Sequence, residues 1–255
     1  MIKCSYQRLL FNITHIWFSK EVIKNIKCDI AYFHGIKDNT YIKNCFSWKQ
    51  PSLITDLNQS EDNLFSLIKK NYRYDIKRSQ KDGTYCKMYK SQEFLANEEL
   101  ICVFENTFNE MFKSKGMKDV FNRRLFIQYL KNNSLAVSIG YHNNIPLVFH
   151  SYVIDGDNVR FFYSCSPFRQ EKKMSELIGR LNKALHWFDI KEFKSDSKKK
   201  YDWGGVFDFD KPNGIDSFKM SFGGKPITYF NYIVGISLIG KIAILLLKLK
   251  NKFIR

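Results

Sequence analysis

The chain has 255 residues, of which 44% are hydrophobic and 16% aromatic, enough for a buried core and too many for a disordered chain. Its formal net charge is +16, from 41 Lys and Arg against 25 Asp and Glu. This excess predicts an anionic partner, which would be nucleic acid, a phosphorylated small molecule or an anionic membrane surface. An AT-rich genome that favours lysine codons is the alternative source of the excess.

Cysteine spacing excludes a zinc knuckle. No two of the six cysteines lie within four residues of each other, so there is no CxxC pair and we predict no metal site. The first residues reach charged side chains too early to leave an apolar signal-peptide core. We therefore expect free thiols and a cytoplasmic location.

The first half of the chain alternates between strand and helix patterns. Apolar periodicity, turn residues and the N-cap candidate Ser60 predict these elements. In chain order they are a strand over 26–36 with Ile30, Tyr32 and His34 on one face, a helix over 60–80, a strand over 84–89, and helices over 93–115 and 122–131.

The second half begins with a meander. Two tight turns separate three strand-like runs, and a long helix follows them. The whole order predicts an α+β fold with a central mixed, largely antiparallel sheet flanked by helices. The predicted elements are strands over 135–141, 147–154 and 159–164, a helix over 171–194, a short strand at 201, a helix over 215–221 and a strand over 226–232.

The C-terminal segment 233–255 is apolar and then basic. The 19 residues 229–247 just reach the length of a membrane span, but Lys241 and two glycines argue against one. We favour a helix that lies in a membrane interface, with a helix packed on the protein and a spanning helix as the alternatives. We therefore predict one domain over 1–232 followed by this helix.

The helix over 171–194 carries a third stripe beside its apolar face. Ser175, Gly179, Asn182 and His186 recur at helical spacing, so they could line a cleft or form a neutral boundary. The turn that precedes this helix offers backbone N–H groups to a pyrophosphate. Arg169, Gln170 and Lys172 are the candidate residues there.

Two paired-glycine motifs stand near the end of the chain. They read Tyr201-Asp-Trp-Gly-Gly and Phe218-Lys-Met-Ser-Phe-Gly-Gly, and such pairs indicate backbone that bends sharply or approaches a ligand closely. With the basic helix motif in 71–83, they resemble the FemABX-like branch of the GNAT acyltransferase superfamily. The resemblance spans about 72–229. It implies a single GNAT-like domain that uses acyl-CoA or aminoacyl-tRNA as a co-substrate and holds no permanently bound cofactor.

The resemblance departs from the GNAT pattern at the donor site. GNAT enzymes carry a Gln/Arg-x-x-Gly-x-Gly/Ala loop around the CoA pyrophosphate, whereas none of the five residues after Arg169 is a glycine here. Aminoacyl-tRNA therefore stays open as the donor, although we favour acyl-CoA.

Acyl transfer to an amine needs a base and a group that stabilises the oxyanion. The resemblance makes Lys219 the candidate for oxyanion or phosphate stabilisation. Asp202 either orients the acceptor amine or caps its own turn. His150 and His186 are candidates for a base or an acceptor contact, and each could equally be a hydrogen-bonded core residue. Tyr201, Phe218, Arg73 and Arg78 complete the candidate substrate-binding residues, the two arginines either holding a phosphate or forming a solvated helix face.

We therefore predict an enzyme that transfers an acyl group to the amine of a nucleotide- or lipid-linked amino sugar. Such acceptors belong to cell-surface polysaccharide or cell-wall biosynthesis at the inner membrane surface. One alternative is an aminoacyl-tRNA-dependent transferase that acts on a cell-wall precursor. The alternative from a different class is a basic nucleic-acid-binding protein without catalysis, against which no recognisable binding motif can be found.

Overall fold

The computed structural model describes residues 1–23, 25–43, 45–118 and 120–252. The chain forms two compact units, one of Met1–Ser52 with Pro226–Arg255 and one of Leu53–Lys225. The predicted domain over 1–232 includes parts of both units, and this boundary stays a prediction.

The first unit is a small sheet with one helix. Strands β1 (Ile2–Arg8) and β2 (Phe11–Trp17) pair antiparallel, β2 pairs parallel with β3 (Ile30–Ile36), and β3 pairs antiparallel with β10 (Lys225–Gly235). The first part of β4 (Cys45–Asp56) also belongs to this unit. Residues of alternating faces pack into two separate cores, as the two-residue period of a strand requires.

The C-terminal helix α8 (Leu238–Lys252) covers one of these cores. Its Ile244 is buried with Ile13, Ile30 and Ile233. The opposite side of α8 leaves six large apolar side chains exposed, and these are Leu238, Ile239, Ile242, Leu245, Leu246 and Leu249. Within the described residues, no helix is both long enough and apolar enough to cross a bilayer.

The second unit holds a mixed sheet in the order β4-β9-β8-β7-β6-β5. Neighbours pair antiparallel except β8 and β9, which are parallel. Together with the helices described next, this arrangement confirms the predicted α+β class. The strands that have not yet been given are β5 (Thr84–Lys90), β6 (Leu135–His142), β7 (Ile145–Asp155), β8 (Asn158–Cys165) and β9 (Lys200–Asp202).

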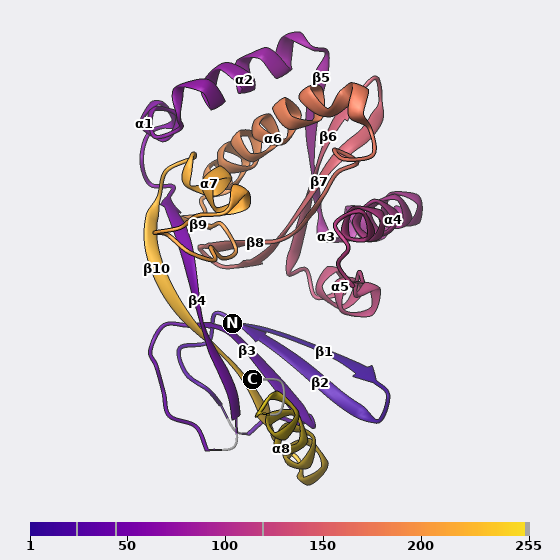
Figure 1. The fold of residues 1–255 in the computed structure, drawn as a ribbon, viewed down its shortest axis with the longest axis vertical. Helices are drawn as coiled ribbons and strands as arrows, with labels where there is room; N and C mark the ends of the chain where they lie inside the picture. Colours follow the sequence, from indigo (N-terminus) through magenta and orange to yellow (C-terminus); the bar gives the residue numbers. More distant parts are fainter. Residues whose placement is uncertain (24, 44, 119, 253–255) are drawn as a thin grey trace. The chain divides into compact units, whose positions relative to one another are not determined.

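Helices cover both faces of this sheet (Figure 1). His150 of β7 faces α6, whereas its neighbour Phe149 stacks on Phe104 of α4. Helices α6 and α2 therefore lie on one face, and α3, α4 and α5 lie on the other. Their bounds are α1 (Glu61–Ser66), α2 (Lys70–Lys81), α3 (Ser91–Leu95), α4 (Glu98–Ser114), α5 (Arg123–Lys131), α6 (Ser175–Ser195) and α7 (Gly214–Met220).

Three predicted helices are broken near one end or in the middle. The helix over 60–80 is two helices, because the chain turns at Leu67 and the backbone N–H of Lys69 donates to the carbonyl of Ser221. The helix over 93–115 is split into α3 and α4, because the side chain of Asn97 accepts from Leu100 N and starts a new helix. The helix over 171–194 begins as a 3₁₀ turn, η1 (Lys172–Met174).

Both predicted glycine pairs adopt left-handed backbone. Gly204 and Gly205 have φ of +78° and +111°, and Gly223 and Gly224 have +79° and +120°. A Cβ on Gly204 would lie 2.3 Å from the carbonyl oxygen of Phe161. The close approach that the motif predicts is thus made, at Gly204, to the protein's own β8.

Candidate active site

A pocket opens where β8 and β9 part. The two strands pair over only three residues each, ending at Arg160 and Asp202, while β8 continues to Cys165. The pocket encloses about 480 Å³ beside this unaccompanied half of β8. Side chains of α6, α7 and the end of α4 form its other walls.

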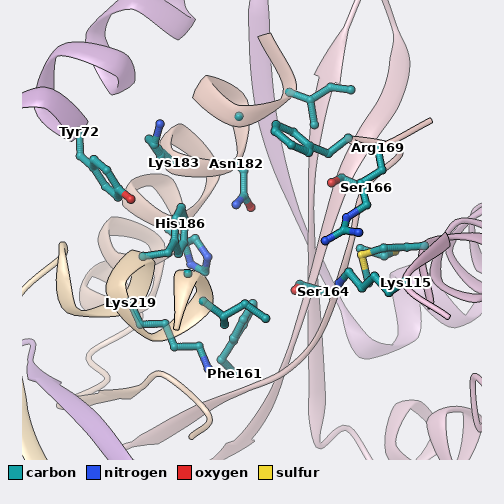
Figure 2. Close-up of a pocket in the computed structure, with 18 residues that line it drawn as sticks. Tyr72, Lys115, Phe161, Ser164, Ser166, Arg169, Asn182, Lys183, His186 and Lys219 are labelled. Atoms are coloured by element: carbon teal, nitrogen blue, oxygen red, sulfur yellow. The ribbon is translucent and has the colours of Figure 1, made fainter. Parts of the chain in front are cut away.

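The pocket is basic. Lys115, Arg169, Lys183 and Lys219 line it, and no acidic residue does so in the part of the chain that the structure describes. Figure 2 shows Tyr72, His186 and Lys219 on one side and Ser164, Ser166 and Arg169 on the other. These walls suit a molecule with an anionic portion, since clefts lined by one sign of charge concentrate the opposite sign.

Lys219 extends from α7 into this pocket. Its Nζ donates to the carbonyl oxygen of Gly205 at 2.5 Å, which ties the helix to the first glycine pair. Burial lowers the pKa of Lys219 to about 8, while the charge of Asp202 opposes part of this shift. The ammonium is thus poorly solvated and available to a developing negative charge.

Asp202 lies behind the pocket wall. Its Oδ2 forms a buried ion pair with Arg160 Nη1 at 2.6 Å, and its Oδ1 accepts from the backbone N–H of Gly204 at 2.9 Å. The carboxylate therefore holds the glycine turn and supports the charge of Lys219. It is outside the set of residues that line the pocket.

A buried chain of hydrogen bonds runs beneath the pocket floor. Asp189 Oδ2 lies 2.8 Å from His150 Nδ1 and 2.5 Å from Tyr152 Oη. Tyr152 Oη lies 2.8 Å from Tyr201 Oη, which lies 2.9 Å from His186 Nδ1. At the other end, His150 Nε2 lies 2.8 Å from Oδ1 of Asn182. Both terminal residues, Asn182 and His186, line the pocket.

The surroundings determine the protonation of the residues in this hydrogen-bonded network. Burial, followed by the nearby His150 and Lys219, lowers the pKa of His186 well below its ordinary value. Burial and the charge of Asp189 raise the pKa values of Tyr152 and Tyr201. At neutral pH the imidazole of His186 is therefore uncharged and both phenols keep their protons.

Three residues of this hydrogen-bonded network have side chains of the types that bind metal ions. Nitrogen and oxygen atoms of His150, His186 and Asp189 lie within 4.8 Å of one another, close enough to share an ion. Nδ1 of each histidine and Oδ2 of Asp189 are already hydrogen-bonded within the protein. We therefore describe the group as a hydrogen-bonded network.

The predicted stripe of α6 faces the pocket over most of its length. Gly179, Asn182 and His186 line it, whereas the hydroxyl of Ser175 donates to the carbonyl of Lys172. Phe218 also lines the pocket, and Tyr201 is buried beneath it.

The predicted basic face of α2 lies elsewhere. Arg73 and Arg78 are outside the pocket lining, and Arg78 pairs with Asp82 at 3.2 Å. Their predicted role in substrate binding stays a prediction.

In the turn that was predicted to bind a pyrophosphate, two backbone N–H groups are already hydrogen-bonded within the turn. Arg169 lines the pocket, while Gln170 and Lys172 are exposed and outside its lining. The backbone N–H groups of Gln170 and Glu171 both donate to the carbonyl of Pro167. The expectation of free amides is therefore wrong for these two residues, because the turn closes on itself before η1 begins.

Sequence reasoning missed two members of the buried network, although their signals were present. The stripe of α6 continues at the same spacing to Asp189, and Tyr152 lies two residues after His150 on the same face of β7. The remaining pocket residues come together only through the fold. Among them, Tyr72, Met111, Lys115, Phe161, Ser164, Ser166 and Lys183 were also missed.

Comparison with known proteins gives structural matches alone. No protein-family model matches the chain, and no curated protein matches its sequence. FemX superposes with a TM-score of 0.58 at 11% identity, over 89% of this chain and 82% of FemX. The C-terminal DUF2156 domain of an Agrobacterium fabrum protein gives 0.54 at 10%, over 85% and 71% of the two chains. L-PGS from Bacillus licheniformis gives 0.51 at 12%, over 85% and 71%.

These likenesses define the fold of the chain. The chain shares the fold of FemX, of the DUF2156 domain and of L-PGS. The resemblance predicted from the two glycine-paired motifs is thereby confirmed at the level of the fold. Sequence identities of 10–12% identify the fold of the chain and not its substrates.

Proposed function

We propose that this protein is an acyltransferase that moves an acyl group from an activated donor to an amine. The observation that carries the proposal is the pairing, in one basic pocket, of a buried lysine with an uncharged histidine. Lys219 supplies a poorly solvated positive charge, and His186 supplies a neutral imidazole. Acyl transfer to nitrogen needs both, one for the oxyanion and one for the proton.

The favoured donor is an acyl-CoA, and an aminoacyl-tRNA is the alternative. Both present phosphates to a basic wall, and Arg169 and Lys115 are placed on it. The turn at Pro167–Glu171 lacks the glycine loop that GNAT enzymes carry around the CoA pyrophosphate, so aminoacyl-tRNA stays open as the donor. The acceptor in either case is the amino group of a nucleotide- or lipid-linked amino sugar, or of a cell-wall precursor.

We further propose that the protein works at an anionic membrane surface from the cytoplasmic side. The exposed face of α8 consists of the six apolar residues named above, with Lys241 and Lys248 on the same helix. An amphipathic helix of this kind lies in the lipid interface, and the net charge of +16 complements anionic headgroups. A membrane location would bring the pocket near lipid-linked acceptors.

Turnover with matched donors tests the proposal. Purified protein is incubated with acetyl-CoA and a UDP-linked amino sugar, and separately with aminoacyl-tRNA and a peptidoglycan precursor. Amide formation is followed by mass spectrometry. We expect product with one pair, and a loss on the order of a hundredfold in kcat/KM for Lys219→Met.

Lys211→Met is the control for this experiment, because Lys211 is exposed in the loop before α7 and lies outside the pocket lining. It should keep the wild-type rate. Absence of product with both pairs, together with equal binding of charged and uncharged tRNA, would overturn the proposal and leave the basic nucleic-acid-binding protein in its place.

A further inference from the structure

We infer that His186 is the general base of this site and that Asp189, acting through Tyr152 and Tyr201, holds it in the tautomer that presents a bare Nε2 to the acceptor amine. This inference rests on the proposed acyl transfer for its chemistry. The orientation of the imidazole rests on the hydrogen-bond geometry alone.

The direction of each hydrogen bond follows from the carboxylate. A carboxylate accepts hydrogen bonds and cannot donate them. Tyr152 therefore donates its single O–H proton to Asp189 Oδ2 at 2.5 Å. Tyr201 must then donate to the oxygen of Tyr152 across 2.8 Å, because Tyr152 has no second proton. This leaves the oxygen of Tyr201 as an acceptor.

His186 completes the sequence of donors. With the Tyr201 proton already committed, the contact of 2.9 Å between Tyr201 Oη and His186 Nδ1 requires a proton on Nδ1. A neutral imidazole carries one such proton, so Nε2 keeps its lone pair. The hydrogen bond of the His186 side chain is at Nδ1, and His186 lines the pocket, so the inference assigns the lone pair of Nε2 to a bound amine.

The groups that face His186 favour the neutral form. Tyr201 approaches from β9, His150 from β7 at a ring separation of 4.1 Å, and Lys219 from α7. Asp189, on the same helix, opposes this preference, because a carboxylate oxygen lies within 4.8 Å of a ring nitrogen of His186. The rings that pack on His186 are aromatic and solvate a charge poorly. Burial and the two nearby basic groups therefore oppose protonation, and the rings in contact are those of Phe161, Trp203, Phe218 and Phe222.

The step that this arrangement performs balances as follows. The acceptor nitrogen attacks the acyl carbon, a C–N bond forms, and the negative charge on the carbonyl oxygen is stabilised by Lys219. The proton of the attacking nitrogen passes to Nε2 of His186. The C–S bond of an acyl-CoA, or the C–O bond of an aminoacyl ester, then breaks, and the proton on Nε2 leaves with the thiol or hydroxyl.

The tautomer can be measured without any substrate. Nitrogen-15 shifts of the histidine rings distinguish a protonated from a bare nitrogen, and His186→Gln identifies the signals that belong to His186. We expect Nδ1 protonated and Nε2 bare in the wild-type protein at pH 7. A protonated Nε2 would overturn the inference.

Asp189→Asn tests the cause of this orientation. The amide can donate to Tyr152, which reverses each bond of the chain and moves the proton of His186 from Nδ1 to Nε2. Should Asp189→Asn unfold, Tyr152→Phe removes the link between Asp189 and Tyr201 and should mix the two tautomers. Tyr141→Phe is the control, because it deletes one phenol from a hydrogen-bonded tyrosine pair of 2.7 Å outside the network and should leave the ring signals unchanged.

Kinetics then separate this inference from the proposed function. Where turnover is found, Asp189→Asn and His186→Gln should each lower kcat on the order of a hundredfold with little change in KM, and Tyr141→Phe should not. The acid limb of the wild-type pH profile should disappear in His186→Gln. A bare Nε2 in a protein without turnover refutes the proposed function alone, whereas turnover with a protonated Nε2 refutes the inference alone.

Discussion

Gly204 follows Asp202 and Trp203 in a turn that only a residue without a side chain fits. Its φ of +78° is left-handed, and a Cβ would overlap the carbonyl oxygen of Phe161 at 2.3 Å. Gly156 also has a left-handed φ, of +52°, but a Cβ there would meet nothing within 4 Å. The two positions therefore separate the cost of backbone conformation from the cost of a clash.

We expect Gly204→Ala to lower the free energy of unfolding by at least about 2 kcal/mol more than Gly156→Ala does. Gly156→Ala should cost only about 1 kcal/mol, because its penalty is conformational. Urea unfolding of the two variants measures the difference. Equal losses would show that β8 moves away from residue 204 without cost.

Lys219 gives the protein a pH-dependent stability. Its pKa falls from the ordinary 10.5 to about 8 on folding, so between these values the unfolded chain binds the proton that the folded protein has lost. The free energy of unfolding should therefore rise with pH across this window, by up to about 3 kcal/mol from this group. Lys219→Met should lack this rise. If the free energies of unfolding of the two proteins changed in parallel between pH 8 and 10.5, the lowered pKa of Lys219 would be contradicted.

At the scale of elements, two ion pairs join α2 to α6. Lys183 Nζ lies 2.7 Å from Asp75 Oδ2, and Arg180 Nε lies 2.7 Å from Asp82 Oδ2. Lys183 lines the pocket and Arg180 does not. The pairs are thus alike in geometry and differ in their closeness to a bound anion.

Asp75→Asn should tighten the binding of an anionic donor severalfold, because it leaves the charge of Lys183 without its partner at the pocket wall. Asp82→Asn is the matched control and should leave this affinity unchanged. Isothermal titration of CoA into both variants compares them. An equal affinity would mean that Lys183 does not contact the anion.

The exposed face of α8 makes a separate prediction. Replacing Leu245 and Leu246 by Glu should abolish association with vesicles of anionic lipid, since it removes apolar contact and adds repulsion. Replacing Gln80 and Lys81 of α2 by Glu lowers the net charge by even more, at a place away from this helix. Sedimentation with vesicles should be lost in the first variant and largely kept in the second.

Elements with strong local signals were predictable from the sequence. The meander β6 to β8 and helix α5 have their predicted positions within a residue or two, because regular apolar periods end in Asn and Gly turns. The position of His150 in the middle of a strand and the place of His186 in the helical stripe likewise made both candidates, and both belong to the buried network. Strands β1 and β2 were missed although Ile2 and Cys4 alternate with polar residues, and this alternation was a usable signal.

What could not be predicted depends on contacts far apart in the chain. The break at Leu67 rests on a bond from Lys69 to Ser221, and the pocket brings Lys115 to Lys219 across about a hundred residues. No local pattern contains such information. The same reason explains why Asp202 could be identified as a turn-capping candidate but not as the partner of Arg160.

At the scale of the whole molecule, the charge of +16 affects every measurement with a polyanion. Raising salt from roughly 50 to 200 mM should weaken binding to any RNA by orders of magnitude, whichever function holds. The quantity that discriminates is the ratio of affinities for charged and uncharged tRNA at a fixed salt concentration. We expect a ratio above one only if the aminoacyl ester enters the pocket.

Gly204 also bears on how this protein would change over evolutionary time. A copy that had lost its chemistry would still need a glycine at 204 in order to fold, because the obstacle is the backbone of β8. The same copy would be free to vary His186 at its pocket-facing edge and Lys219 at its tip. Under the proposed function, every descendant that folds would keep the glycine turn, and only the descendants that still transfer acyl groups would keep His186 and Lys219.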